Sequence, residues 1–144
     1  NINYGDVNLW GIDGSVFFFM KQNLSLECTF SFLGKKKFYN FLTRDYDPIN
    51  APKYKINTTM IYMPTSGMNL NISMRHIPEF DWASGVHYGT IHSYTVMDVG
   101  IGYNFDSPYD LLLNVSNINN DYHNEIIGGP KLGRHVTLKF SVRL

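Results

Sequence analysis

The sequence has almost no cysteine, no net charge and no long hydrophobic run. Its one cysteine, Cys28, excludes a disulfide framework within these 144 residues, and we expect it to act as a small apolar side chain. The 12 basic and 12 acidic residues cancel. A neutral chain lacks the basic surface that nucleic acids require, so we expect no nucleic-acid partner. The longest purely apolar run, Val16 to Met20, is far shorter than the roughly 20 residues of a membrane-spanning helix.

Sequence signatures of enzymes and metal sites are missing too. The five histidines show no H-x-x-x-H spacing and no cysteine partner, so we expect no bound metal and no other cofactor. Serine, histidine and aspartate are present, but no G-x-S-x-G motif accompanies them. We therefore expect no catalytic residues and a protein that is not an enzyme.

Alternation of apolar and polar residues is the strongest positive feature. From Arg134 to Leu144 every second residue is apolar, and the residues between are polar or charged. Because a β-strand directs successive side chains to opposite faces, this pattern predicts a strand with one apolar and one polar face. Similar patterns predict six further strands, and no segment has a competing helical period. These strands are expected at residues 7–20, 24–32, 54–63, 68–74, 97–105 and 111–116.

The connections between these strands alternate in length. Short turns are expected at residues 21–23, 65–67 and 106–110, and long loops at residues 34–53, 78–90 and 121–133. Tight periplasmic turns and long extracellular loops are typical of outer-membrane barrels. The pattern therefore predicts an all-β fold, an antiparallel up-and-down transmembrane β-barrel. Its C-terminus would lie on the periplasmic side.

About seven strands do not close a bacterial barrel, because strand numbers there are even and begin at eight. An open sheet in lipid would leave unpaired backbone groups, each costing several kcal/mol. We therefore expect residues 1–144 to form one C-terminal segment of an outer-membrane barrel, an arc of a larger barrel, with the remaining strands absent. The chain does not begin with Met and is expected to be mature or truncated.

Several short segments resemble one family. The sequence has Asn50-Ala51-Pro52-Lys53 before one strand and Tyr94-Thr95-Val96-Met97-Asp98 at the start of another. An asparagine-rich stretch at residues 114–122, NVSNINNDY, is followed by GGPKLGR at residues 128–134 and by the last alternating strand. In this order and spacing, the segments resemble the C-terminal end of TonB-dependent outer-membrane receptors.

The resemblance implies a barrel of about 22 strands with an N-terminal plug domain in its lumen. Such receptors lie in the bacterial outer membrane, bind a scarce ligand and import it with energy passed from TonB through the plug. The ligand would be a ferric siderophore, cobalamin or a glycan. The expected partners are membrane lipid, the chain's own plug domain and remaining strands, TonB and that ligand. The chain itself would supply barrel wall and extracellular loops.

Two groups of residues are candidates for contacts in such a receptor. Bases and aromatics in the long loops are predicted to contact ligand, since aromatics supply contact area and cations attract anions. They are Lys37, Phe38, Tyr39, Arg44, Tyr46, Trp82, His87, Tyr88 and His123. The basic loop could equally face lipopolysaccharide, and the aromatics of residues 80–92 are predicted more strongly as an outer girdle at the membrane interface.

The second group is a polar lumen wall. Its members are predicted to be Glu27, Arg75, Asp98 and Lys139. Arg75 and Asp98 lie on neighbouring strands at similar height, so we expect them to pair. Such a partly wet ion pair contributes about 0–1 kcal/mol.

Two alternatives to a transporter stay open at this point. A soluble up-and-down barrel could hold a small apolar ligand, and it would bury Phe30, Val99 and Phe140 inside the protein. An outer-membrane barrel enzyme would need a nucleophile beside a histidine near the rim.

Overall fold

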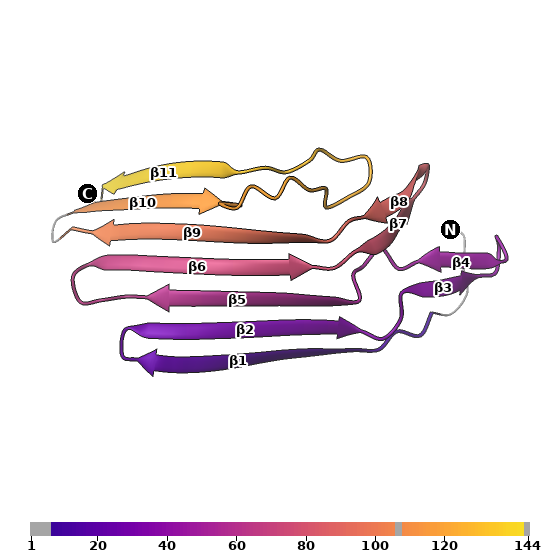
Figure 1. Ribbon diagram of the computed structural model, residues 1–144, viewed down its shortest axis with the longest axis horizontal. Coiled ribbons are helices and arrows are strands. Elements are labelled where there is room, and N and C mark those ends of the chain that lie inside the picture. The colour runs from indigo at the N-terminus through magenta and orange to yellow at the C-terminus, as the bar shows by residue number, and fades with distance from the viewer. Residues whose placement is uncertain (1–6, 106–107, 143–144) are drawn as a thin grey trace.

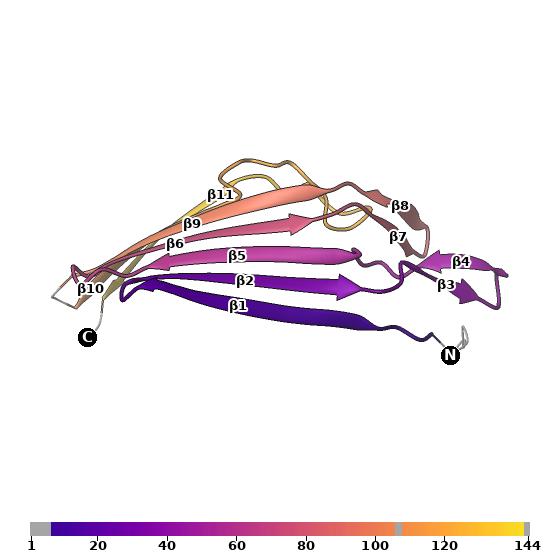
Figure 2. The ribbon, with the colours of Figure 1, turned by 60° about the horizontal axis from the view of Figure 1, so that its bottom comes forward.

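The computed structural model describes residues 7–105 and 108–142. Its main element is one antiparallel sheet of seven strands, in the order β1-β2-β5-β6-β9-β10-β11 (Figure 1). The sheet is twisted and curved rather than flat (Figure 2). In the described part of the chain, β1 and β11 form its two open edges. The strands are β1 (Gly11–Lys21), β2 (Leu24–Leu33), β5 (Tyr54–Tyr62), β6 (Met68–Ile77), β9 (Tyr94–Asn104), β10 (Tyr109–Ser116) and β11 (His135–Val142).

These seven strands confirm the predicted fold class and strand positions. Strands that follow one another pair antiparallel across short turns, and the long loops all lie at the opposite end of the sheet (Figure 1). The last strand ends at the short-turn end, where Val142 pairs with Tyr109. The predicted continuation of this strand to Leu144 and part of the predicted turn at residues 106–110 lie outside the described residues. Within those residues, no helix is long and apolar enough to cross a membrane.

Two long loops carry small hairpins that the sequence patterns did not reveal. One consists of β3 (Lys37–Asn40) and β4 (Asp45–Pro48), and the other of β7 (Phe80–Ser84) and β8 (His87–Ile91). Four or five residues are too few for alternation to stand out from chance. Both hairpins lie at the long-loop end of the sheet (Figure 1).

The strand register places most apolar residues of the seven strands on one face. One row crosses the whole sheet, since each member lies directly opposite the next. That row is Phe18, Leu26, Met60, Ile72, Val99, Val115 and Val136. No part of the described chain buries this face, because Ile101 is 43% exposed and Leu138 is 66% exposed. We call it the outer face.

A soluble barrel would hide these side chains in a dry interior. Phe30 and Phe140 are instead 47% and 61% exposed. The buried apolar side chains of the described residues are few and lie on the opposite, polar face, at the long-loop end: Ile77, Ile91, Tyr94 and Val96. Four side chains at about 1.5–3 kcal/mol each do not supply the core of a soluble domain of this size.

Candidate ligand-binding site at the long-loop end

The polar face ends, at the long-loop end, in a cleft of about 530 Å³. We call this 530 Å³ space the mouth cleft. Strands β5, β6 and β9 form one side, β7 forms another, and the loop after β10 contributes a carboxylate. The lining residues are Asn50, Ala51, Pro52, Lys55, Asn57, Arg75, Ile77, Phe80, Trp82, Tyr94 and Glu125.

Two cations enter the mouth cleft from neighbouring strands. Arg75 on β6 lies directly opposite Asn57 on β5. Lys55 precedes Asn57 by two residues, so it lies on the same face and diagonal to Arg75, a relation that places Cα atoms about 7–8 Å apart. In residues 7–105 and 108–142, no carboxylate lies within ion-pair distance of Lys55, which is exposed. The cleft is therefore suited to an anionic group.

Aromatic side chains form the opposite side of the mouth cleft. Phe80 and Trp82 of β7 lie with ring centroids 6.5 Å apart, and both pack against the buried cluster that contains Tyr94 and Val96. These two cluster residues share the polar face with Arg75, since Val96 lies opposite Arg75. The prediction of an outer girdle is therefore wrong for Phe80 and Trp82, because hairpin β7–β8 turns their side chains over the polar face.

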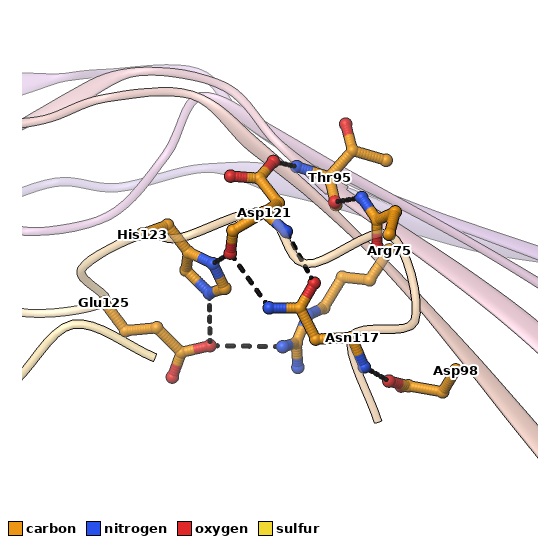
Figure 3. Close-up of polar contacts among 8 residues, drawn as sticks. Arg75, Thr95, Asp98, Asn117, Asp121, His123 and Glu125 are labelled. Carbon is orange, nitrogen blue, oxygen red and sulfur yellow. Dashed lines mark hydrogen bonds and ion pairs between the residues drawn. The ribbon is translucent and has the colours of Figure 1, made fainter. Parts of the chain in front are cut away.

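The asparagine-rich stretch holds the loop after β10 against β9. Strand β10 ends at Ser116, and beyond that point the backbone of β9 needs other partners. Side chains supply most of them, and the Ile118 backbone amide donates to the Met97 carbonyl at 2.7 Å. Asn119 accepts from the Met97 amide at 3.0 Å and donates to the Thr95 carbonyl at 2.7 Å, and Asp121 accepts from the Thr95 amide at 2.8 Å. The loop thus continues the pairing of the sheet with side chains (Figure 3).

Asn117 fixes the bend at which this loop leaves the sheet. Its backbone has φ of 55°, a left-handed conformation that asparagine tolerates better than most residues. Its side chain accepts from the Asp121 amide at 2.9 Å and donates to the Asp121 carbonyl at 2.9 Å. The backbone amide of Asn117 donates to the Asp98 carboxylate at 2.8 Å (Figure 3). Asp98 therefore anchors the loop.

The predicted Arg75–Asp98 ion pair is wrong. Asp98 lies opposite Ser73, so the two charged residues are diagonal neighbours, and each has a closer partner. Asp98 accepts from Asn117, whereas Arg75 Nη2 lies 3.1 Å from Glu125 Oε1. The sequence did not identify Glu125, because a loop residue 50 positions from its partner leaves no spacing signal.

His123, a predicted ligand contact, is buried. Its ring stacks on Tyr94 with centroids 4.0 Å apart, and its side chain is only 6% exposed. Nδ1 lies 2.6 Å from the Asp121 carbonyl oxygen. Nε2 points toward Glu125 Oε1 at 3.8 Å and has no hydrogen-bond partner among the described residues (Figure 3). Contact between ligand and His123 stays a prediction, and the structure assigns the ring a place beside Glu125.

The first hairpin gathers most of the predicted basic and aromatic residues. Lys37, Phe38, Tyr39 and Tyr46 line a cleft of about 320 Å³, and the rings of Tyr39 and Tyr46 lie 5.4 Å apart. Arg44 lies apart from this cleft, in the turn between β3 and β4, with φ of 54°. These contacts with ligand stay predictions.

The two hairpins are joined to each other. Lys37 Nζ lies 3.2 Å from Asp81 Oδ2, across the hairpins. Asn50, in the segment before β5, donates to the Ala83 carbonyl and accepts from the Ala83 amide, both at 2.7 Å. Residues of both hairpins line a further cleft of about 550 Å³.

The remaining predicted residues of the second hairpin lie on β8. Tyr88 is 72% exposed. His87 packs its ring against Gly128 of the loop after β10, where an added Cβ would lie 2.7 Å from the ring. Gly128 has φ of 82°, so this close approach requires glycine.

The four residues predicted for the lumen wall share the polar face. Glu27, Thr59, Ser73 and Asp98 form one row across four strands. Arg75 follows on β6, and Lys139 lies opposite Leu112 at the other edge. Among the described residues, no group of three histidine, cysteine or acidic side chains could hold a metal ion.

An open, curved antiparallel sheet with an uncovered apolar face, tight turns at one end and elaborate loops at the other is the architecture of a segment of a transmembrane β-barrel wall. Solved structures similar to this fold include siderophore receptors.

The chain is similar to the ferric enterobactin receptor PfeA of Pseudomonas aeruginosa, with a TM-score of 0.71 and 15% identity over 92% of the chain. It is similar to the ferric-catecholate import receptor Fiu of E. coli, with a TM-score of 0.70 and 17% identity over 92%. It is also similar to the siderophore receptor PirA of Acinetobacter baumannii, with a TM-score of 0.71 and 16% identity over 92%. The chain spans only 22%, 20% and 21% of these receptors. The predicted resemblance to TonB-dependent receptors is thus confirmed for the fold.

No protein-family model matches the chain, and no curated protein matches it.

Proposed function

We propose that this chain forms part of the barrel wall of a TonB-dependent receptor in the bacterial outer membrane, and that the receptor imports a ferric siderophore. The observation that carries the proposal is the division of the sheet into two faces. Apolar rows cover the outer face, no described residue packs on them, and the polar face opens into a cleft with two cations. The similar structures include ferric siderophore receptors.

The outer face has the dimensions that a bilayer requires. On β9 its apolar residues run from Met97 to Tyr103 within a strand of 11 residues. Strands of about 9–11 residues, tilted by about 45°, cross the hydrocarbon core. Lipid is therefore the proposed partner of the outer face.

The polar face would enclose the lumen and meet the plug domain. Under this proposal residues 1–144 form one segment of the barrel, and further strands pair with the open edges of β1 and β11. Ligand would first bind at the mouth cleft and loops, the plug would respond, and TonB would supply the energy for passage. The chain described here contributes wall and loops to that sequence of events.

The lining of the mouth cleft favours an anionic siderophore over cobalamin or a glycan. Arg75 and Lys55 attract negative charge, and Phe80 and Trp82 offer rings for apolar contact.

The test uses cells in which the receptor containing this chain is the only route for ferric siderophores. Uptake of radioactive iron supplied as ferric enterobactin is measured with and without functional TonB. The proposal expects uptake that stops without TonB. If correctly assembled receptor takes up no ferric siderophore, the proposal is contradicted. If it takes up only cobalamin, in a TonB-dependent way, the proposed ligand is wrong and cobalamin is the ligand.

A further inference from the structure

We propose that Arg75 recognises the anionic groups of the ligand in the mouth cleft, and that Glu125 occupies Arg75 until the ligand displaces it. The inference rests on the proposed function and deepens it, because it assigns the recognition residue and an internal competitor. It concerns negatively charged ferric complexes that bind iron through oxygen atoms.

The Arg75–Glu125 contact has the features of a replaceable pair. Both residues line the mouth cleft, and the contact joins Nη2 to Oε1 at 3.1 Å. The side chains are 47% and 41% exposed. Half-exposed ion pairs of this kind contribute little, about 0–1 kcal/mol. An anion with several oxygen atoms can offer the guanidinium more than one hydrogen bond, since the planar group presents five N–H donors in a fork.

A second side chain, His123, lies next to Glu125. The same Oε1 atom lies 3.8 Å from His123 Nε2, a buried atom with no hydrogen-bond partner among the described residues. Because the Asp121 carbonyl can only accept, the close contact at His123 Nδ1 places a proton on that nitrogen.

Displacement by a ligand would leave the Glu125 carboxylate beside His123. The charged and titratable groups around His123 are Tyr94 of β9, Arg75 of β6, and Asp121 and Glu125 of its own loop. When an anionic ligand takes Arg75, Glu125 is left beside His123 with its carboxylate half-exposed to solvent. Figure 3 shows Glu125 between these two partners.

The surroundings of Arg75 fit an anionic complex with aromatic or flat groups. Lys55 supplies a second positive charge diagonal to Arg75 on the same face. Phe80 and Trp82 also line the cleft and supply aromatic contact area, with ring centroids 6.5 Å apart.

The test measures binding to purified full-length receptor. The probes are ferric enterobactin, which is negatively charged, and a ferric trihydroxamate without net charge. Arg75→Gln is expected to lower affinity for the anionic probe by roughly tenfold to a hundredfold, as for a lost hydrogen bond to a charged group. Glu125→Gln is expected to raise that affinity, by up to about fivefold. Combined with Arg75→Gln, Glu125→Gln is expected to give no gain.

Glu79→Gln is the matched control. Glu79 lies 3.1 Å from the exposed His92, at the same end of the sheet but outside the mouth cleft. Glu79→Gln removes the same charge from the same region, so a general electrostatic effect on ligand affinity would appear in this variant as well. The account expects no change in this control.

Three outcomes overturn the inference. If Glu125→Gln lowers affinity as Arg75→Gln does, the pair merely holds the loop in place. If Arg75→Gln leaves affinity for the anionic probe unchanged while the wild type binds it, recognition lies elsewhere and the proposed function stands. A wild-type receptor that binds neither probe overturns both the inference and the proposed function.

Discussion

Asn117 allows the anchoring of the loop after β10 to be tested quantitatively. Replacing it with alanine removes two side-chain hydrogen bonds to Asp121, one to the amide and one to the carbonyl. Each contributes about 1 kcal/mol. The change also places a Cβ-bearing residue without a compensating polar group at φ of 55°, which costs roughly 1–2 kcal/mol. We therefore expect the anchored state of the loop to lose about 3–4 kcal/mol.

Asn117→Gly separates the two contributions. Glycine loses the same hydrogen bonds but accepts positive φ without penalty, so we expect a loss of only about 2 kcal/mol. Native-state hydrogen exchange of full-length receptor in detergent measures the loss in both variants. The reporting amides are those of Thr95 and Met97, which donate to side chains of this loop. Exchange there is expected to accelerate about 30-fold in the glycine variant and more in the alanine variant. Unchanged exchange in both variants would refute the anchoring role, and equal acceleration would refute the backbone contribution.

Two further substitutions test the faces of the sheet and the packing of the second hairpin. Leu138→Arg on the outer face is expected to cost about 2–4 kcal/mol in the bilayer, whereas Thr137→Arg, next to it on the polar face, is expected to cost far less. The amount of folded receptor in outer membranes, seen as heat-modifiable migration on gels, compares them, and equal losses would contradict the assignment of faces. Gly128→Ala is expected to destabilise the contact with His87 by at least about 1 kcal/mol, because positive φ and a 2.7 Å approach both oppose a Cβ. Faster proteolysis of the loop after β10 in intact cells measures this, and unchanged proteolysis would count against the packing.

The seven strands were predictable because each crosses the sheet once, with one apolar and one polar face. A period of two is visible in a single sequence when it persists for six or more residues, as it does from His135 to Val142. The alternation of short and long connections was sufficient to predict that all long loops lie at one end of the sheet.

The candidate site was predictable only in part. Arg75 was placed on the polar face correctly, because side-chain direction follows from alternation. Its partner Glu125 was missed, because the loop after β10 folds back through side-chain hydrogen bonds of Asn117 and Asn119, which no periodicity reports. The inward position of Trp82 was missed for a similar reason, since the direction of a short hairpin depends on tertiary packing.

The central claim is that the apolar face of the sheet contacts lipid and the polar face contacts water. It is tested most directly by nitroxide spin labels placed singly at residues 136–141 of β11 in full-length receptor, reconstituted in bilayers with Cys28 replaced by alanine. Collision with oxygen, which concentrates in lipid, and with a water-soluble nickel complex is measured at each position. The account predicts strict alternation, with Val136, Leu138 and Phe140 accessible to oxygen and the residues between them accessible to nickel. Alternation of the opposite phase, or none, would contradict it.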